Sequence, residues 1–183
     1  MKIRFLWLGA LIAAFTLVAA SCGADDSASN AGGEIGGVVA PDAGAAGPAF
    51  VELVDVGTGE TTSLNEALYP GNGNPTLAFF WAPFCPSCRV EAPELDDLAA
   101  SHGDEINIVG IGTRDDLAYA EEFLESTGVE NFPLLWEESG QSWQDFGVIA
   151  QPYLILLDDG QEVQRWPGGA TDEMILSELS KLT

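Results

Sequence analysis

The stretch around residues 76–88 restricts the possible folds more than any other part of this chain. An apolar run from Thr76 to Trp81 is followed by two cysteines, Cys85 and Cys88, and by a helical pattern that continues to about His102. A continuous apolar run of this length is typical of a strand buried on both faces of a sheet. The cysteines are therefore expected at a strand-to-helix junction, where free N–H groups and the helix dipole stabilise a thiolate on the first sulfur. This position and spacing indicate a redox-active pair.

Strand-like and helical patterns alternate along residues 49–183, which is typical of a single α/β domain. Residues 63–66 fit a capping box for a short helix, Thr171 suits the N-cap of the last helix, and residues 158–160 fit a hairpin turn. Pro93 is expected to kink the helix that follows the cysteines. The expected strands are residues 50–56, 76–81, 106–112, 133–136, 153–157 and 161–166, and the other expected helices are residues 115–126 and 142–146.

The first 21 residues resemble the signal peptide of a bacterial lipoprotein. A short basic start precedes residues 5–20, an uncharged apolar stretch of 16 residues, and small residues lead up to Cys22. A membrane-spanning helix usually needs roughly 18 or more apolar residues, so a permanent span is the weaker interpretation. Residues 19–22 resemble a lipobox, which would make Cys22 the lipid-bearing first residue of the mature protein. From Cys22 to residue 48 the chain is predicted to be a flexible tether rich in Gly, Ala, Ser, Asp and Pro.

The chain has three cysteines, and an odd number leaves one unpaired in an exported protein. Lipidation of Cys22 would account for the unpaired one. Cys85 and Cys88 then remain as one pair. The alternative interpretation of the pair is an inert, stabilising disulfide in a binding module. A bridge that closes so short a loop removes little entropy from the unfolded chain, so stability alone is a poor reason for it.

The chain is strongly acidic, with 29 acidic and 6 basic residues. Without the signal peptide it keeps four basic residues and a formal charge of about −25. Such a surface repels nucleic acid and anionic lipid headgroups, which excludes nucleic-acid binding. Basic partners and life in high salt both stay open, and a well-hydrated surface is the simplest interpretation.

The motifs together resemble the thioredoxin superfamily, a central mixed β-sheet flanked by helices. More closely, the chain is similar to the extracytoplasmic TlpA/ResA/DsbE-like branch, and especially to actinobacterial secreted DsbE-like proteins. The closer resemblance depends on residues 88–93 (Cys-Arg-Val-Glu-Ala-Pro), on residues 110–114 (Gly-Ile-Gly-Thr-Arg) and on Gln151-Pro152 before the hairpin. It covers about residues 50–183.

The resemblance implies a role for each matching residue. Cys85 corresponds to the exposed attacking cysteine and Cys88 to the more buried resolving one. Pro152 corresponds to a cis-proline that lies against the disulfide and helps to receive the substrate backbone. Glu91 corresponds to a buried acid under the active site, and Trp81 to the aromatic residue that begins the motif.

Contact with substrate is expected at four positions, namely Trp81, Phe84, Pro86 and Gln151. Core or rim packing is the simpler interpretation of Trp81 and Phe84. Pro86 lies between the cysteines, and Gln151 stands where thioredoxins usually carry Thr or a β-branched residue. Both positions are associated with tuning of the redox potential in the superfamily, so the direction of electron flow stays open.

Glu91 lies three residues beyond Cys88, and helical spacing places both on one face. Burial beneath an apolar sheet would raise the pKa of a carboxyl group, which could then hold and deliver a proton near neutral pH. The alternative is an ordinary solvated glutamate.

The expected activity is thiol–disulfide exchange with exported proteins, without a dissociable cofactor. The chain is interpreted as a disulfide-forming oxidant, with a reductant for cytochrome c maturation as the alternative. A membrane redox partner is expected to recycle the cysteine pair, and the N-terminal lipid to anchor the protein outside the cytoplasm.

Metal binding and peroxidase chemistry are the rival interpretations. A structural zinc site needs about four ligands, and the domain offers only Cys85, Cys88 and His102. A copper chaperone on the same fold usually separates its cysteines by three residues and adds a downstream histidine. Peroxiredoxins generally place a Thr before a lone attacking cysteine. No metal site is therefore predicted.

Overall fold

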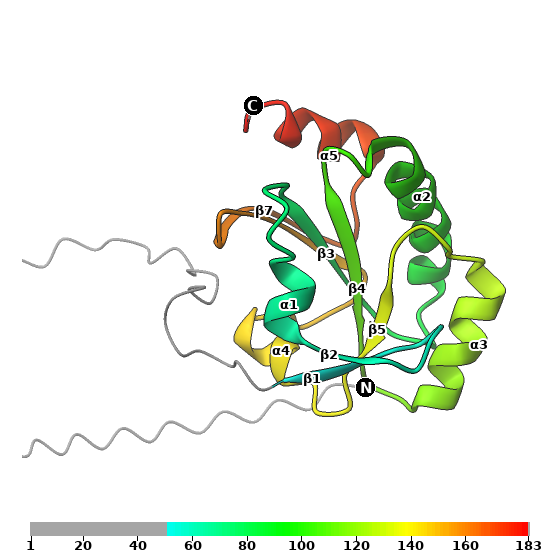
Figure 1. Cartoon of the computed structure of the whole chain (residues 1–183). Coiled ribbons are helices and arrows are strands. Elements are labelled where there is room, and N and C mark those ends of the chain that lie inside the picture. Colours follow the sequence, from blue (N-terminus) through cyan, green and yellow to red (C-terminus); the bar gives the residue numbers. More distant parts are fainter. Residues whose placement is uncertain (1–50, 183) are drawn as a thin grey trace, which may run out of the picture. The chain divides into compact units, whose positions relative to one another are not determined.

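A computed structural model describes residues 51–182 (Figure 1). The predicted signal peptide, Cys22 and the predicted tether lie outside the described residues. The strands are β1 (Glu52–Asp55), β2 (Thr61–Ser63), β3 (Thr76–Trp81), β4 (Asn107–Gly112), β5 (Leu134–Trp136), β6 (Tyr153–Asp158) and β7 (Gln161–Pro167). The helices are α1 (Leu64–Leu68), α2 (Pro86–His102), α3 (Leu117–Thr127), α4 (Gln141–Asp145) and α5 (Asp172–Leu179).

The strands form one mixed sheet in the order β2-β1-β5-β4-β3-β6-β7. The three central strands β5, β4 and β3 are parallel, β6 and β7 form an antiparallel hairpin beside β3, and β1 and β2 add antiparallel strands at the other edge. The hairpin is where residues 158–160 predicted it. The expectation of a mixed sheet flanked by helices is confirmed.

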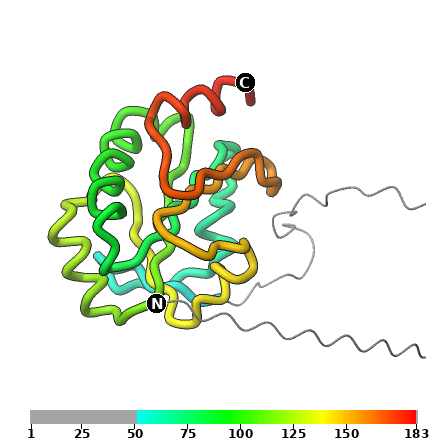
Figure 2. The backbone as a smooth tube through the Cα atoms, turned by 180° about the vertical axis from the view of Figure 1, so that it is seen from behind, coloured from blue at the N-terminus to red at the C-terminus, as the bar shows by residue number. Residues whose placement is uncertain are grey.

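Helices cover both faces of the sheet (Figures 1 and 2). One apolar core lies between the sheet and α2, α3 and α5, and a second lies between the sheet and α1 and α4. All six residues of β3 are buried, because this strand is central and both of its faces are covered. Its uninterrupted apolar sequence is therefore what its position requires.

The predicted N-terminal caps are present on α1 and α5. The side chain of Ser63 accepts a hydrogen bond from the Glu66 N–H, and the Glu66 carboxylate accepts one from the Ser63 N–H, which completes the predicted capping box of α1. Thr171 caps α5 by accepting a hydrogen bond from the Met174 N–H. Helix α2 continues on both sides of Pro93.

The pairing of the strands brings three loops together at one edge of the sheet, the edge formed by the ends of β3 and β4 and the start of β6. Trp81, the last residue of β3, lies beside Gly112, the last residue of β4. Phe80 lies beside Tyr153, the first residue of β6. The loop after β3, the loop after β4 and the loop before β6 therefore meet at this edge. Within residues 51–182, no helix is both long and apolar enough to cross a membrane.

Candidate active site

Cys85 and Cys88 form a disulfide at the start of α2. Cys85 is the N-cap of the helix, with an extended backbone (φ −83°, ψ 110°), and Pro86 occupies the first turn, where its missing N–H costs no helical hydrogen bond. The Cys85 Sγ accepts a hydrogen bond from the Cys88 N–H at 3.1 Å. The chain thus turns from β3 into α2 through the reactive pair, as the sequence predicted.

Cys85 is less exposed than the sequence predicted. In the disulfide form it retains 4% of its accessible surface and Cys88 retains none. The expectation of an exposed Cys85 is corrected to a buried residue that is only slightly more accessible than its partner. The reason is that Cys85 packs with the apolar core between α2 and the sheet. Neighbouring Phe84, 44% exposed, Pro86 and Ser87 are exposed.

Trp81 lies in the core, so the expectation that it contacts substrate is wrong. Its side chain has no exposed surface and stacks on Phe123 of α3, with ring centroids 4.3 Å apart. Gly110 and Gly112 on β4 make room for the indole, since a Cβ on Gly112 would lie 2.5 Å from the Trp81 Cε2. The tryptophan at the end of β3 therefore fixes the packing of the strand that leads to the cysteines.

The loop before β6 supplies the other wall of the site. The Gln151–Pro152 peptide bond is cis, and the Pro152 carbonyl accepts a hydrogen bond from the Gly168 N–H at 2.9 Å. Pro152 is buried and Gln151 is half-buried. Ile149, which precedes them, is 83% exposed.

Two arginines contact the loops of the site, and sequence reasoning assigned no role to either. Arg89 donates to the Pro83 carbonyl at 2.8 Å and to the Ser126 hydroxyl, and its guanidinium lies 5.1 Å from the centroid of the Phe123 ring. It thereby joins the cysteine loop to α3. Arg114 contacts the loop before β6. A signal that could have pointed to them is the small number of basic residues, because only four follow residue 4.

Glu91 is half-buried on α2 and faces the connection between β7 and α5. Its carboxylate accepts a hydrogen bond from the Ala170 N–H at 2.9 Å. Burial raises the pKa of Glu91, the Ala170 N–H opposes that shift, and the charges of Glu94 and Asp172 add to it. The prediction of a carboxyl group with a raised pKa agrees with this environment.

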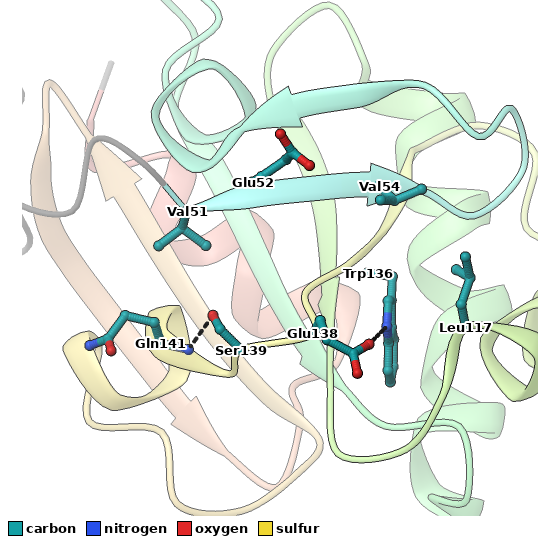
Figure 3. A pocket seen from close by; sticks show the side chains of 8 residues that line it. All are labelled: Val51, Glu52, Val54, Leu117, Trp136, Glu138, Ser139 and Gln141. Atoms are coloured by element: carbon teal, nitrogen blue, oxygen red, sulfur yellow. Dashed lines mark hydrogen bonds between the residues drawn. The ribbon is translucent and has the colours of Figure 1, made fainter.

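A cavity of about 650 Å³ lies away from the disulfide (Figure 3). Its walls come from β1, the start of α3, the end of β5 and the segment leading into α4, and an apolar slot is formed by Val54, Leu117 and Trp136. None of the predicted site residues lines it. Within residues 51–182, no cluster of three or more His, Cys, Asp or Glu side chains could hold a metal ion.

The mixed sheet, the cysteine pair at the helix N-terminus and the cis-proline loop at the same edge define a thioredoxin-like protein. Residues 39–166 match the AhpC/TSA family, and the chain belongs to that family. The structure is similar to that of dsbF from MTB (Mycobacterium tuberculosis), with a TM-score of 0.62 and 30% identity, over 72% of this chain and 94% of that one. The predicted thioredoxin-like fold and DsbE-like resemblance are both confirmed.

Two curated relatives extend the comparison. The chain is 34% identical to the soluble secreted antigen MPT53 of Mycobacterium tuberculosis over 97 residues, which is 51% of this chain and 55% of that protein. It is 38% identical to the thiol:disulfide interchange protein DsbE of Yersinia pestis over 95 residues, 52% of this chain and 48% of that protein. The chain thus spans about half the length of the curated relatives that it matches.

Proposed function

We propose that this protein is an extracytoplasmic thiol–disulfide oxidoreductase that forms disulfides in exported proteins. The observation that carries the proposal is the Cys85–Cys88 disulfide at the N-terminus of α2. A helix N-terminus stabilises the thiolate that the exchange reaction releases or uses. The similarity to a thiol:disulfide interchange protein supports the same reaction class.

In the proposed reaction a substrate thiolate attacks the Cys85 sulfur. The bond between Cys85 and Cys88 breaks, a mixed disulfide forms, and Cys88 leaves as a thiolate that takes up a proton. A second substrate thiolate then attacks the substrate sulfur of the mixed disulfide and releases Cys85. The substrate loses two electrons and two protons, and the cysteine pair gains them. Glu91, with its raised pKa, is proposed to exchange protons with the site.

Substrate is proposed to bind over the exposed surface around the disulfide. Phe84 and Pro86 lie in the loop after β3, and Gln151 and Pro152 lie in the loop before β6, which meets it at the same edge of the sheet. An extended substrate segment could pair its backbone with the loop that precedes Pro152. Trp81, being buried, has no part in this surface.

The protein is further proposed to be held at the outer face of the cell membrane by a lipid on Cys22, after removal of residues 1–21. A membrane redox partner would reoxidise the pair after each cycle. Mass spectrometry of the protein purified from its membrane fraction should find a diacylglycerol on Cys22. A mature protein that begins elsewhere, without lipid, would remove the anchor from the proposal.

The activity is tested by oxidation of a dithiol peptide with the parent, Cys85→Ser and Cys88→Ser. Cys85→Ser and Cys88→Ser are both expected to be inactive, because neither variant retains a disulfide to transfer. Mixed instead with the disulfide form of the peptide, Cys88→Ser is expected to hold the peptide as a mixed disulfide on Cys85, because the Cys88 thiol that would release it is absent. Full activity of Cys85→Ser would refute the proposal. Equilibration with glutathione gives the direction: a potential near about −120 mV supports an oxidant, and one near about −270 mV a reductant.

A further inference from the structure

Arg89 and Arg114 differ from the other basic side chains of this acidic domain. Among the described residues, Arg165 pairs with Glu162 and Lys181 pairs with Glu178. With residues 51–182, Arg89 and Arg114 form no such pair, and their hydrogen bonds go to carbonyl, amide and hydroxyl oxygens. Both of these arginines contact a loop beside the disulfide.

Arg114 holds the loop before β6 by two hydrogen bonds and contacts α4 by a third interaction. Its guanidinium donates to the Ile149 carbonyl and to the Gln151 Oε1, each at 3.3 Å. The same guanidinium lies 4.7 Å from the centroid of the Trp143 ring on α4, a cation–π contact. Arg114 therefore ties the residues before Pro152 to both β4 and α4.

The backbone of Arg114 is itself unusual. Its φ is +77°, in the left-handed region that non-glycine residues seldom adopt and that concentrates at functional sites. The residue follows Gly112 and Thr113 at the end of β4, and the Thr113 N–H donates to the Trp81 carbonyl at 3.4 Å. The turn thus begins beside the end of β3, the strand that leads to the cysteines.

The segment that Arg114 holds has little else to fix it. Within the described part of the chain, Ile149, Ala150 and Gln151 form no backbone–backbone hydrogen bond. Ile149 and Ala150 are exposed. A short segment that pairs with no strand of its own sheet is suited to pair with an extended peptide, provided that a side chain keeps it in place.

We infer that Arg114 is a positioning residue that holds residues 149–151 in the conformation that receives an extended substrate. The inference rests on the proposed function and deepens it. Because the disulfide is placed by α2 and not by this loop, loss of Arg114 weakens the binding of an extended peptide and leaves the exchange step unchanged. A small dithiol, which does not pair with the loop, reacts at the parent rate.

The test uses Arg114→Asn, since asparagine tolerates the left-handed backbone better than most residues. Arg114→Lys keeps the charge but lacks the planar fork that reaches two acceptors at once. Lys181→Asn is a control with the same change of charge, outside the site. Steady-state oxidation of a dithiol peptide, with oxidised glutathione as the recycling oxidant, and the rate of reduction by dithiothreitol are measured for each.

Arg114→Asn is expected to raise the KM for the peptide about tenfold, with kcat and the dithiothreitol rate within twofold of the parent. Arg114→Lys is expected to lie between the two, and Lys181→Asn to equal the parent. Amide hydrogen exchange gives an independent readout, because the Gly168 N–H is bonded to Pro152. That amide is expected to exchange about tenfold faster in Arg114→Asn.

An unchanged KM in Arg114→Asn overturns the inference, as does an equal loss of kcat with both substrates, which indicates a merely structural role. Should Arg114→Asn fail to fold, Arg114→Lys decides the question by the same two measurements. If the parent itself oxidises no peptide, the proposed function fails. The exchange of Gly168 then still decides whether Arg114 holds the loop.

Discussion

The Glu91 carboxylate and the Ala170 N–H are joined by a hydrogen bond of 2.9 Å across 79 residues of sequence. The bond ties α2, whose first turn carries the disulfide, to the connection between β7 and α5. The Gly169 backbone packs closely against the same carboxylate. Glu91 is therefore both a packing element and a titratable group, and the two roles can be separated by experiment.

The titration of Glu91 should appear in the pH dependence of stability. Burial raises its pKa in the folded state above the ordinary value of 4.5. The folded protein then binds more protons than the unfolded chain between the two values, so the free energy of unfolding falls as pH rises through the folded pKa. Glu91→Gln is expected to remove this fall and to make the protein relatively more stable at neutral pH.

Urea unfolding of the parent and Glu91→Gln between about pH 4 and pH 8 measures this effect. Exposed Glu121 on α3 provides a matched control, because Glu121→Gln makes the same change of charge at the surface. If the two variants show the same difference from the parent at every pH, Glu91 contributes no specific titration.

Alanine substitutions at Gly168 and Gly169 test how closely the backbone packs against the Glu91 carboxylate. Both have a positive φ, +91° and +100°, so an alanine at either position costs about 1–3 kcal/mol of backbone strain. A Cβ on Gly169 would also overlap the Glu91 carboxylate, whereas one on Gly168 meets nothing within 4 Å. Gly169→Ala is expected to destabilise by about 1–3 kcal/mol more than Gly168→Ala.

Chemical denaturation of both variants gives this difference, and Glu91→Ala combined with Gly169→Ala should abolish the extra cost. An equal loss of stability in Gly168→Ala and Gly169→Ala would show that the Glu91 carboxylate moves aside without lowering the free energy of unfolding.

Much of the fold could be predicted because single elements carried strong local signals. Strand β3 was predicted to the residue, since its buried apolar sequence ends abruptly at the loop before Cys85. Strand β2 was missed, because its three residues have no apolar pattern and owe their conformation to pairing with β1. A short edge strand of this kind is formed by tertiary contact rather than by its own sequence.

Site residues were predicted where short spacing or the resemblance pointed to them, and they were missed where neither did. Cys85, Cys88 and the proline before β6 follow from spacing and resemblance. Arg114 contacts residues 35 and 37 positions away, and no periodic pattern connects such distant positions. The burial of Trp81 could also not be read from the sequence, because it depends on the room that Gly110 and Gly112 leave on the neighbouring strand.

The contact between Trp81 and Gly112 predicts a strong coupling. A Cβ on Gly112 would lie 2.5 Å from Cε2 and 2.6 Å from Cζ2 of the indole, and both strands are paired on each side within the sheet. Gly112→Ala is expected to destabilise the protein by about 1–3 kcal/mol. Trp81→Phe removes these atoms, so the double variant should lose less stability than the sum of the single variants.

The measurement is a double-mutant cycle by urea unfolding. Gly57→Ala is the control, because a Cβ at that position would have ordinary contacts of 3.4 Å. Additive losses within about 0.5 kcal/mol would show that the indole does not limit the space at Gly112.

The redox state of the cysteine pair should change thermal stability in a direction that depends on the function. The Cys88 N–H already donates to the neutral Cys85 sulfur in the disulfide form, and a Cys85 thiolate in the reduced protein interacts more strongly with this N–H and with the dipole of α2. Against this, a disulfide that closes a four-residue loop stabilises the folded state by about 2 kcal/mol through the unfolded chain. For an oxidant the first effect must exceed the second, since a strong oxidant is one whose reduced form is stabilised.

The reduced protein is accordingly expected to unfold at a Tm a few degrees above that of the oxidised protein at pH 7. Thermal scans by circular dichroism, with and without dithiothreitol, measure the difference, and a Cys85→Ala, Cys88→Ala variant should not respond to the reductant. The difference should shrink at lower pH, because protonation of the thiolate removes its interaction with the helix. If the oxidised form unfolds at the higher temperature at pH 7, the pair favours the disulfide, and the protein is better suited to donate electrons than to accept them.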